Sequence, residues 1–125
     1  MPVAVDLMKK FWDLMATNDF ESVGSVLSDD FVLEWPQSGE RIRGRDNFVA
    51  MNAEYPAYGK WTFTVHRIVG NDVEAVSDVS LTDGTQHARV ISFVTVTDGK
   101  ISKTMEFWPD DFPAPDNRKH LVEMM

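Results

Sequence analysis

The spacing of apolar residues changes near the middle of the chain. Across residues 3–15 apolar side chains recur every three or four positions and charged side chains occupy the opposite face, which predicts an amphipathic helix. Asn18 with Glu21 three positions later has the form of a capping box and predicts a short second helix. The stretch after Gly44, which ends before Pro56, predicts a third helix.

From residue 60 onward apolar residues alternate with polar ones, which is typical of half-buried strands. Four segments with this pattern are separated by the short turns "GND", "DGT" and "DGK": residues 60–70, 72–82, 86–97 and 100–109. Turns this short join antiparallel neighbours. Residues 31–36 predict an earlier strand, and the tail 110–125 predicts an irregular arm that ends in a helical turn.

These elements predict a single α+β domain spanning residues 1–125, because a chain of this length forms one hydrophobic core. Two or three helices in the N-terminal half are expected to pack on one face of a mostly antiparallel sheet. Long strands twist and curl, so the sheet is expected to wrap around the helices as a cone-shaped barrel with an open end. The hollow of this cone is where a ligand would bind.

Charge and composition exclude several classes of function. The net charge is −8 and basic residues are not clustered, which disfavours nucleic-acid binding. The chain has no cysteine, which excludes disulfides, thiolate catalysis and cysteine-ligated zinc. No stretch has the length of a membrane span, and the N-terminus has no signal-peptide pattern. These features predict a cytoplasmic protein that does not bind membranes.

Three stretches carry a resemblance to a known family: "LSDDFVLEWPQSGERIRGRDNF", "RIVGNDVEAV" and "VTDGKISKTMEFWPDDFPAPDNRKHLVE". Together with the order of elements, they resemble the SnoaL-like branch of the nuclear-transport-factor-like, or ketosteroid isomerase-like, superfamily. The resemblance covers nearly the whole chain and implies a cone-shaped barrel, usually dimeric, with a pocket between sheet and helices. It does not imply one reaction, because such proteins include isomerases, cyclases, hydratases, hydrolases and non-catalytic modules.

The comparison with ketosteroid isomerases implies that their catalytic groups are missing here. Trp35 stands where that branch has its catalytic aspartate, immediately before the first-strand proline, and Phe11 stands where it has a hydrogen-bonding tyrosine. The protonated aspartate of the penultimate strand falls near Ser92 when one turn residue is dropped before "DGKI", whereas the tryptophan of the last strand has a counterpart in Trp108. The resemblance therefore implies the same hollow without the known catalyst.

Strand alternation, anchored on these positions, predicts which side chains face the hollow. The expected inward residues, strand by strand, are Leu33 and Trp35; Val76, Asp78 and Ser80; Ala88, Val90, Ser92 and Val94; Thr104, Glu106 and Trp108. Glu34 is expected to face outward. Of these residues, those expected to line a ligand pocket, together with the helical Phe11, are Leu33, Trp35, Val76, Ser80, Ser92, Thr104 and Trp108.

Asp78 and Glu106 would then be two carboxylates in one aromatic-lined cavity. Burial and mutual repulsion raise the pKa of such a pair, so either group could act as acid or base in an isomerase, cyclase or hydratase that needs no cofactor. The alternative is a structural role in which each carboxylate pairs with a neighbouring arginine or hydroxyl. The three histidines lie on different elements and do not form a metal-binding pattern.

The expected ligand is a small apolar or aromatic molecule, because aromatic residues exceed what a dry core needs. The alternative is a non-catalytic module that binds a ligand or only mediates dimerisation. The opposite face of the sheet is apolar enough to predict a homodimer through that face. The residues expected there are Val79, Leu81, Ile91, Phe93, Met105 and Phe107.

Overall fold

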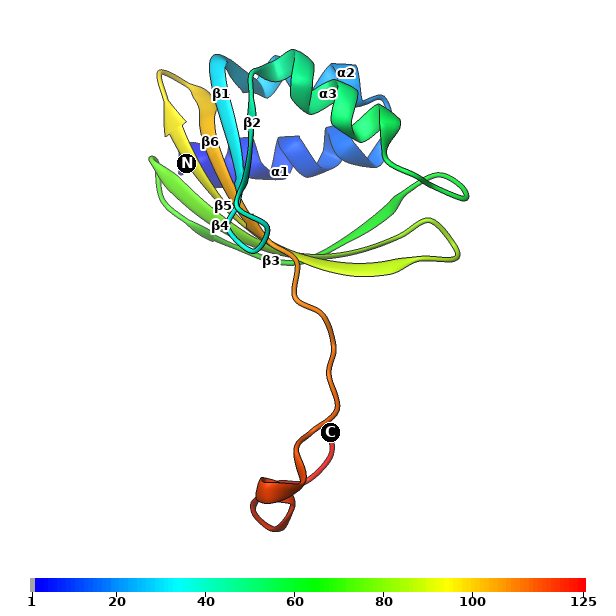
Figure 1. Ribbon diagram of the computed structural model, residues 1–125. Coiled ribbons are helices and arrows are strands. Elements are labelled where there is room, and N and C mark those ends of the chain that lie inside the picture. The colour runs from blue at the N-terminus through cyan, green and yellow to red at the C-terminus, as the bar shows by residue number, and fades with distance from the viewer. Residues whose placement is uncertain (1) are drawn as a thin grey trace.

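The computed structural model describes residues 2–125, in which three α-helices pack against one large curved sheet (Figure 1). Two of the helices precede the first strand in the sequence, and the third lies between the second and third strands. The helical elements are α1 (Val3–Ala16), α2 (Phe20–Val23), the 3-10 turn η1 (Gly24–Val26), α3 (Arg45–Glu54) and the 3-10 turn η2 (Asp116–Leu121). The strands are β1 (Leu27–Trp35), β2 (Glu40–Arg43), β3 (Thr62–Gly70), β4 (Glu74–Thr82), β5 (His87–Thr97) and β6 (Lys100–Phe107). The predicted α+β class is confirmed.

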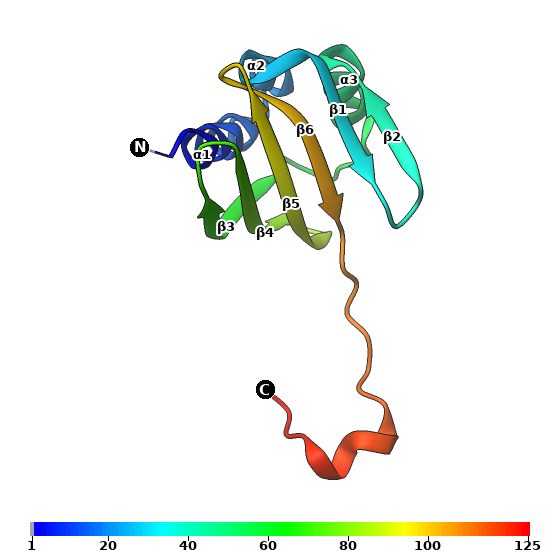
Figure 2. The same cartoon turned by 90° about the vertical axis from the view of Figure 1, so that its left-hand side faces the viewer.

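Within the described residues the strands form one mixed sheet in the order β2-β1-β6-β5-β4-β3. All neighbouring strands are antiparallel except β1 and β6, which run parallel. The sheet is strongly curved but does not close, and the three α-helices cover its concave face (Figures 1 and 2). This is the expected cone, and its concave side holds both the core and the candidate site.

Helix α1 forms because its apolar residues fall on one stripe, and that stripe is buried against the sheet. The predicted capping box after it is wrong. Asn18 adopts a left-handed conformation with φ of 60°, and its side-chain amide exchanges two hydrogen bonds with the backbone of Trp61. Asn18 therefore links the end of α1 to the residue before β3 by hydrogen bonds. Helix α2 begins without a side-chain cap.

The strand β2 was not predicted, and β1 begins at Leu27, four residues earlier than expected. The sequence of β2, "ERIR", has no apolar alternation because the strand lies at the sheet edge and is largely exposed. It pairs with β1 through a tight turn that contains Gly39 with φ of 76°. Glu34 faces outward as expected, where Arg41 and Lys103 bind its carboxylate.

The orientation predicted for β4 is wrong. Four residues, 83–86, lie between the paired Thr82 and His87, so odd-numbered residues of β4 oppose even-numbered residues of β5. Ala75, Ser77 and Val79 are therefore buried on the concave face. The outward residues of β4 are Val76, Asp78 and Ser80, which were expected inside, and the inward ones include Val79 and Leu81, which were expected outside.

Strands β1, β5 and β6, for which the facing of side chains was also predicted, have the orientation that alternation predicts. Leu33 on β1, Val90, Ser92 and Val94 on β5, and Thr104 and Glu106 on β6 are all buried on the concave side. Because residues opposed across antiparallel strands share a face, Ser77, Ser92 and Glu106 form one transverse row. This row lies beneath the C-terminal half of α1 and supplies polar groups to the concave surface.

Gly70 is the position where the β3–β4 hairpin approaches its own backbone most closely. A Cβ added to Gly70 would lie 2.6 Å from the Cα of Ala75 and in contact with the carbonyl oxygen of Glu74. We expect Gly70→Ala to lower the free energy of unfolding by about 1–3 kcal/mol in urea titrations, because the backbone must shift. Gly24→Ala is the control, since its nearest atom, Arg45 Cδ, is 3.9 Å away. Equal stability of the two variants would contradict this reading.

Candidate functional site

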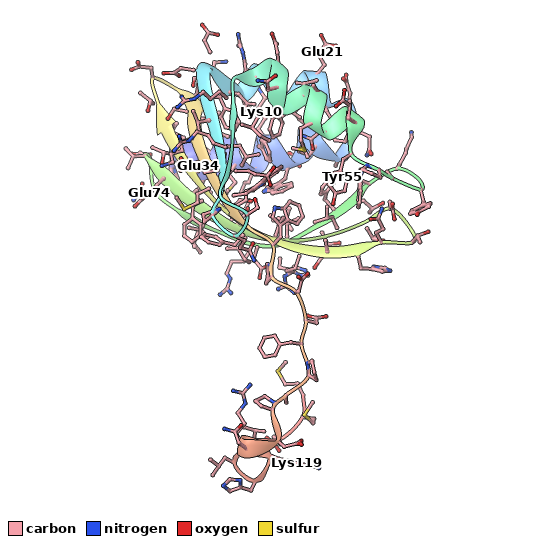
Figure 3. All side chains as sticks on the ribbon, in the orientation of Figure 1. Lys10, Glu21, Glu34, Tyr55, Glu74 and Lys119 are labelled. Atoms are coloured by element: carbon pink, nitrogen blue, oxygen red, sulfur yellow. The ribbon has the colours of Figure 1, made fainter. Side chains whose placement is uncertain are left out.

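A cavity of about 560 Å³ lies between the helices and the concave face, at the end where α3 leads into the loop before β3. Aromatic side chains dominate its wall: Phe11, Trp12, Phe20, Trp35, Phe48, Tyr55, Trp61, Phe63 and Trp108. Its polar lining comes mainly from Gln37, Ser38, Asn52, Gln86, His87, Glu106 and Asp110. Figure 3 shows Tyr55 at the end of α3, beside that loop. Such a wall suits a flat, largely apolar molecule.

Glu106 is the buried carboxyl group of this cavity, with 6% of its surface exposed. The indole Nε1 of Trp35 donates a hydrogen bond of 3.1 Å to Oε1 of Glu106. The hydroxyl of Ser92 donates one of 2.9 Å to Oε2. Because β1, β5 and β6 are adjacent, all three side chains reach one point on the concave face. The carboxyl group is therefore held at both oxygens.

A second indole fixes the next part of the same polar row. Nε1 of Trp12 on α1 donates a hydrogen bond of 3.0 Å to Oγ of Ser77 on β4. Ser77 lies directly opposite Ser92, which in turn lies opposite Glu106. Ser77 and Ser92 are buried behind the cavity wall and hydrogen-bond to Trp12 and Glu106, which line it.

Burial raises the pKa of the Glu106 carboxyl above its ordinary value, while the hydrogen bonds from Trp35 and Ser92 act in the opposite direction. No lysine or arginine among residues 2–125 forms an ion pair with it. The group therefore keeps its proton to a higher pH than a solvated glutamate. A carboxyl whose pKa is raised in this way can act as a proton donor or as a proton acceptor.

Asp78 does not share the cavity with Glu106. It lies on the convex face of the sheet, where Arg89 binds both of its oxygens at 2.5 and 2.7 Å. This pairing with Arg89 lowers the pKa of Asp78. Ser80 lies on the same face and forms a hydrogen bond of 2.7 Å with His66. Of the expected pair, only Glu106 lies in the cavity, where the other carboxylate of the wall, Asp110, is exposed.

The predicted pocket residues fall into three groups. Phe11, Trp35 and Trp108 line the cavity. Leu33, Ser92 and Thr104 are buried in the packed concave surface and do not line it, although Ser92 acts on Glu106. Val76 and Ser80 lie on the convex face.

Sequence reasoning missed the contribution of α3. Phe48, Met51, Asn52 and Tyr55 line the cavity from this helix and the residue after it. Their spacing of three and four residues places them on one face of a helix, so the signal was present. It was obscured because the helix is otherwise polar and only Phe48 is fully buried.

Asp83 ties together two segments at the mouth of the cavity. Its Oδ2 accepts a hydrogen bond of 2.8 Å from the backbone N–H of Tyr58, and its Oδ1 accepts bonds from the N–H groups of Thr85 and Gln86. Burial raises the pKa of this carboxyl, but the backbone donors outweigh burial and lower it strongly. The loop before β3 and the β4–β5 loop are thus held by one carboxylate.

No group of three or more histidine, aspartate or glutamate side chains in residues 2–125 could hold a metal ion. In the same part of the chain, no helix has the length and apolar character needed to cross a membrane.

Comparison with known proteins identifies the class. The family model of the SnoaL-like domain matches residues 8–104, and the chain belongs to this family. The chain is also similar to the crystal structure of a proposed ketosteroid isomerase from Kribbella flavida DSM 17836. The two share 34% identity over 98% of this chain and 90% of that one, with a TM-score of 0.90.

Other solved structures agree on the fold. An NTF-2 like protein of unknown function from Burkholderia xenovorans LB400 has 29% identity over 98% of this chain and 95% of that one, with a TM-score of 0.81. A proposed SnoaL-like polyketide cyclase from Jannaschia sp. CCS1 has 15% identity over 85% of each chain and a TM-score of 0.71, which shows the fold alone. No curated protein matches the chain.

The raised pKa of Glu106 predicts a specific dependence of stability on pH. Below its ordinary value of 4.5 the carboxyl is neutral in both states, and as pH rises toward the folded-state pKa it ionises more readily in the unfolded chain. Stability of the native protein relative to Glu106→Gln should therefore fall as pH rises from about 4.5 and then level off. Chemical denaturation between acidic and mildly basic pH measures this difference.

Glu34→Gln is the matched control for that experiment. Glu34 faces the opposite side of the sheet, and the hydrogen bonds from Arg41 and Lys103 lower its pKa. Its carboxylate therefore stabilises the fold above the ordinary pKa, and the deficit of Glu34→Gln should shrink as pH falls. Parallel pH profiles for wild type and Glu106→Gln would contradict the assignment of Glu106 as a group with a raised pKa.

The lowered pKa of Asp83 predicts the opposite behaviour at the cavity mouth. Its contribution is present above the ordinary value of 3.8 and is lost as pH falls through the folded-state pKa. Asp83→Asn should therefore lower the melting temperature more at pH 7 than at pH 3. Asp13→Asn, which changes an exposed carboxylate on α1, should have a small effect at both values. An equal loss for Asp83→Asn at both pH values would rule out this role for the ionised carboxylate.

Proposed function

We propose that the protein binds a small, largely apolar molecule in the cavity and that Glu106 is the acid–base group acting on it. The observation that carries this proposal is the one buried carboxyl of the cavity, hydrogen-bonded to Trp35 and Ser92, in a wall dominated by aromatic side chains. A carboxyl placed in this way can move a proton to or from a carbon next to a carbonyl group.

The proposed chemistry belongs to the cofactor-independent reactions: isomerisation, cyclisation or hydration. Proton abstraction by Glu106 would leave negative charge on the ligand oxygen, and desolvation by the aromatic wall would strengthen any hydrogen bond to that oxygen. Polar side chains of the cavity wall, among them Asn52 and His87, supply donors for it. The similarity to the Kribbella protein supports an isomerase-type substrate class, a ring-containing ketone.

A non-catalytic binding role is the second candidate, and one observation favours it. Both oxygens of Glu106 already accept hydrogen bonds from the protein, as a purely structural carboxyl would. In that case Glu106 only orients Trp35, and the cavity stores a ligand without changing it. Both candidates use the same binding site. Removal of the carboxyl would abolish the reaction in the first candidate, whereas in the second it would only release Trp35 from its hydrogen bond.

Exchange of α-protons in 2-tetralone, a flat aromatic ketone, separates the two candidates. We expect the wild-type protein to accelerate the loss of the α-proton signal in D2O, followed by proton NMR. Glu106→Gln should retain the affinity for the ketone, measured by quenching of tryptophan fluorescence, and lose about 10²-fold or more of the exchange rate. Native mass spectrometry of freshly purified protein would identify a molecule that copurifies.

The control for this experiment is Asp78→Asn, which removes a carboxylate on the convex face. Its exchange rate should equal that of the wild type. Binding of the ketone without accelerated exchange in the wild type would favour the storage role. Failure of the wild type to bind any apolar probe or to retain a copurified molecule would overturn the proposal as a whole.

A further inference from the structure

All four tryptophans of the chain line the cavity, but their indole N–H groups have different partners. Trp12 and Trp35 donate theirs to side chains of the protein. Within residues 2–125, the indoles of Trp61 and Trp108 donate to no acceptor, although both residues are half-buried and their Nε1 atoms are open to solvent. A donor that an aromatic wall presents without a partner is available to a ligand acceptor.

The backbone of Trp61 is held by one side-chain amide. Asn18, at the end of α1, accepts a hydrogen bond of 2.7 Å from the N–H of Trp61 and donates one of 2.8 Å to its carbonyl oxygen. The ring of Tyr55 packs against the indole, with the ring centroids 6.2 Å apart. These contacts fix the position of Trp61 in the wall and leave its indole N–H unused.

A second side-chain amide holds Trp108 in the same manner. Gln37, in the β1–β2 turn, accepts a hydrogen bond from the backbone N–H of Trp108 and donates one of 3.2 Å to its carbonyl oxygen. Trp108 lies two residues beyond Glu106, and residues two apart along a strand lie on the same face. An oxygen atom bound by the indole of Trp108 would therefore lie on the side of the cavity where the buried carboxyl is.

The two unpartnered donors belong to separate parts of the wall. Trp108 directly follows β6, whereas Trp61 directly precedes β3, and β5 and β4 lie between these strands in the sheet. Neighbouring strands are about 4.8 Å apart. This separation favours two acceptor oxygens on different edges of one molecule over a single oxygen that both indoles share.

We propose that Trp61 and Trp108 recognise the ligand of this cavity, and that this ligand is a flat, ring-containing ketone with a second acceptor oxygen at its far edge. Trp108 donates to the ketone oxygen on the side of Glu106, and Trp61 donates to the second oxygen. Negative charge that develops on the ketone oxygen strengthens the bond from Trp108. This inference rests on the proposed function only in taking the cavity as the binding site, and it does not require the proton transfer.

Three probes with one ring system test the two hydrogen bonds separately. Tetralin carries no oxygen, 2-tetralone carries the ketone oxygen, and 6-methoxy-2-tetralone adds an ether oxygen at the opposite edge. Trp61→Phe and Trp108→Phe keep an aromatic ring and remove the N–H. Calorimetric titration of each variant with each probe gives the loss of affinity, and comparison between probes cancels the loss due to packing.

Each variant should lose affinity in a pattern that identifies its oxygen. Trp108→Phe should weaken binding of both ketones about three- to tenfold more than binding of tetralin, which is the effect of one hydrogen bond. Trp61→Phe should weaken binding of 6-methoxy-2-tetralone by a similar factor relative to 2-tetralone. Phe63→Leu, which changes the same wall without removing a donor, is the control and should weaken all three probes equally.

Asn18→Gly tests whether the amide positions Trp61. Glycine adopts the φ of 60° without strain, so this variant removes the two hydrogen bonds and keeps the backbone conformation. It should reproduce the selective loss of affinity for 6-methoxy-2-tetralone. The discrimination between tetralin and 2-tetralone, which depends on Trp108, should stay at the wild-type value.

The wild-type protein gives a second measurement that does not depend on the folding of any variant. In the ligand-free, 15N-labelled protein, two of the four indole N–H signals should exchange rapidly with water and two slowly, because only two have protein acceptors. Addition of 6-methoxy-2-tetralone should slow the exchange of the two rapid signals.

Two results would overturn this inference and leave the proposed function intact. One is an equal loss of affinity for all three probes in both tryptophan variants, since the indoles would then act by packing alone. The other is equal protection of all four indole N–H groups in the ligand-free protein. Failure of the wild type to bind any of the three probes would contradict both this inference and the proposed function.

Discussion

The packing of α1 across the concave face of the sheet is the contact on which the other features depend. One stripe of this helix serves two purposes along its length. Its first half, with Ala4 and Met8, is completely buried and completes a dry core. Its second half, with Phe11, Trp12 and Met15, is buried too, but it also forms one wall of the cavity. The helix therefore closes the core at one end of the sheet and leaves space at the other.

The buried Glu106 has a cost that the surrounding polar row reduces. A carboxyl in an apolar site loses its hydration, and without hydrogen bonds this would destabilise the fold by several kcal/mol, roughly. Trp35 and Ser92 replace two of the lost water contacts, and no cation neutralises the charge among the described residues. A purely structural position would be filled more favourably by an apolar residue. The proposed proton transfer depends on the presence of this carboxyl.

Sequence alone predicted the class of fold and the orientation of β1, β5 and β6, because a buried face imposes strict alternation on a strand. It failed where alternation was ambiguous. On β4 both faces carry small or aliphatic residues, so the orientation depended on the length of the following loop. It also missed the polar edge strand β2, and it predicted α3 without recognising that one face of this helix lines the cavity. The cavity itself depends on the packing of large aromatic side chains, which spacing does not determine.

The four-residue loop between β4 and β5 has a consequence for how such domains diverge. Its even length decides that Ser77, and not Asp78, lies in the row with Ser92 and Glu106. Insertion or deletion of one residue there would exchange the two faces of β4 and place Asp78 on the concave face, in the row of Ser92 and Glu106 and away from Arg89. A single change in backbone length would thus add a second buried carboxyl to this row without any new side chain. Within this architecture, an insertion or deletion in a hairpin loop can change which side chains lie on the concave face.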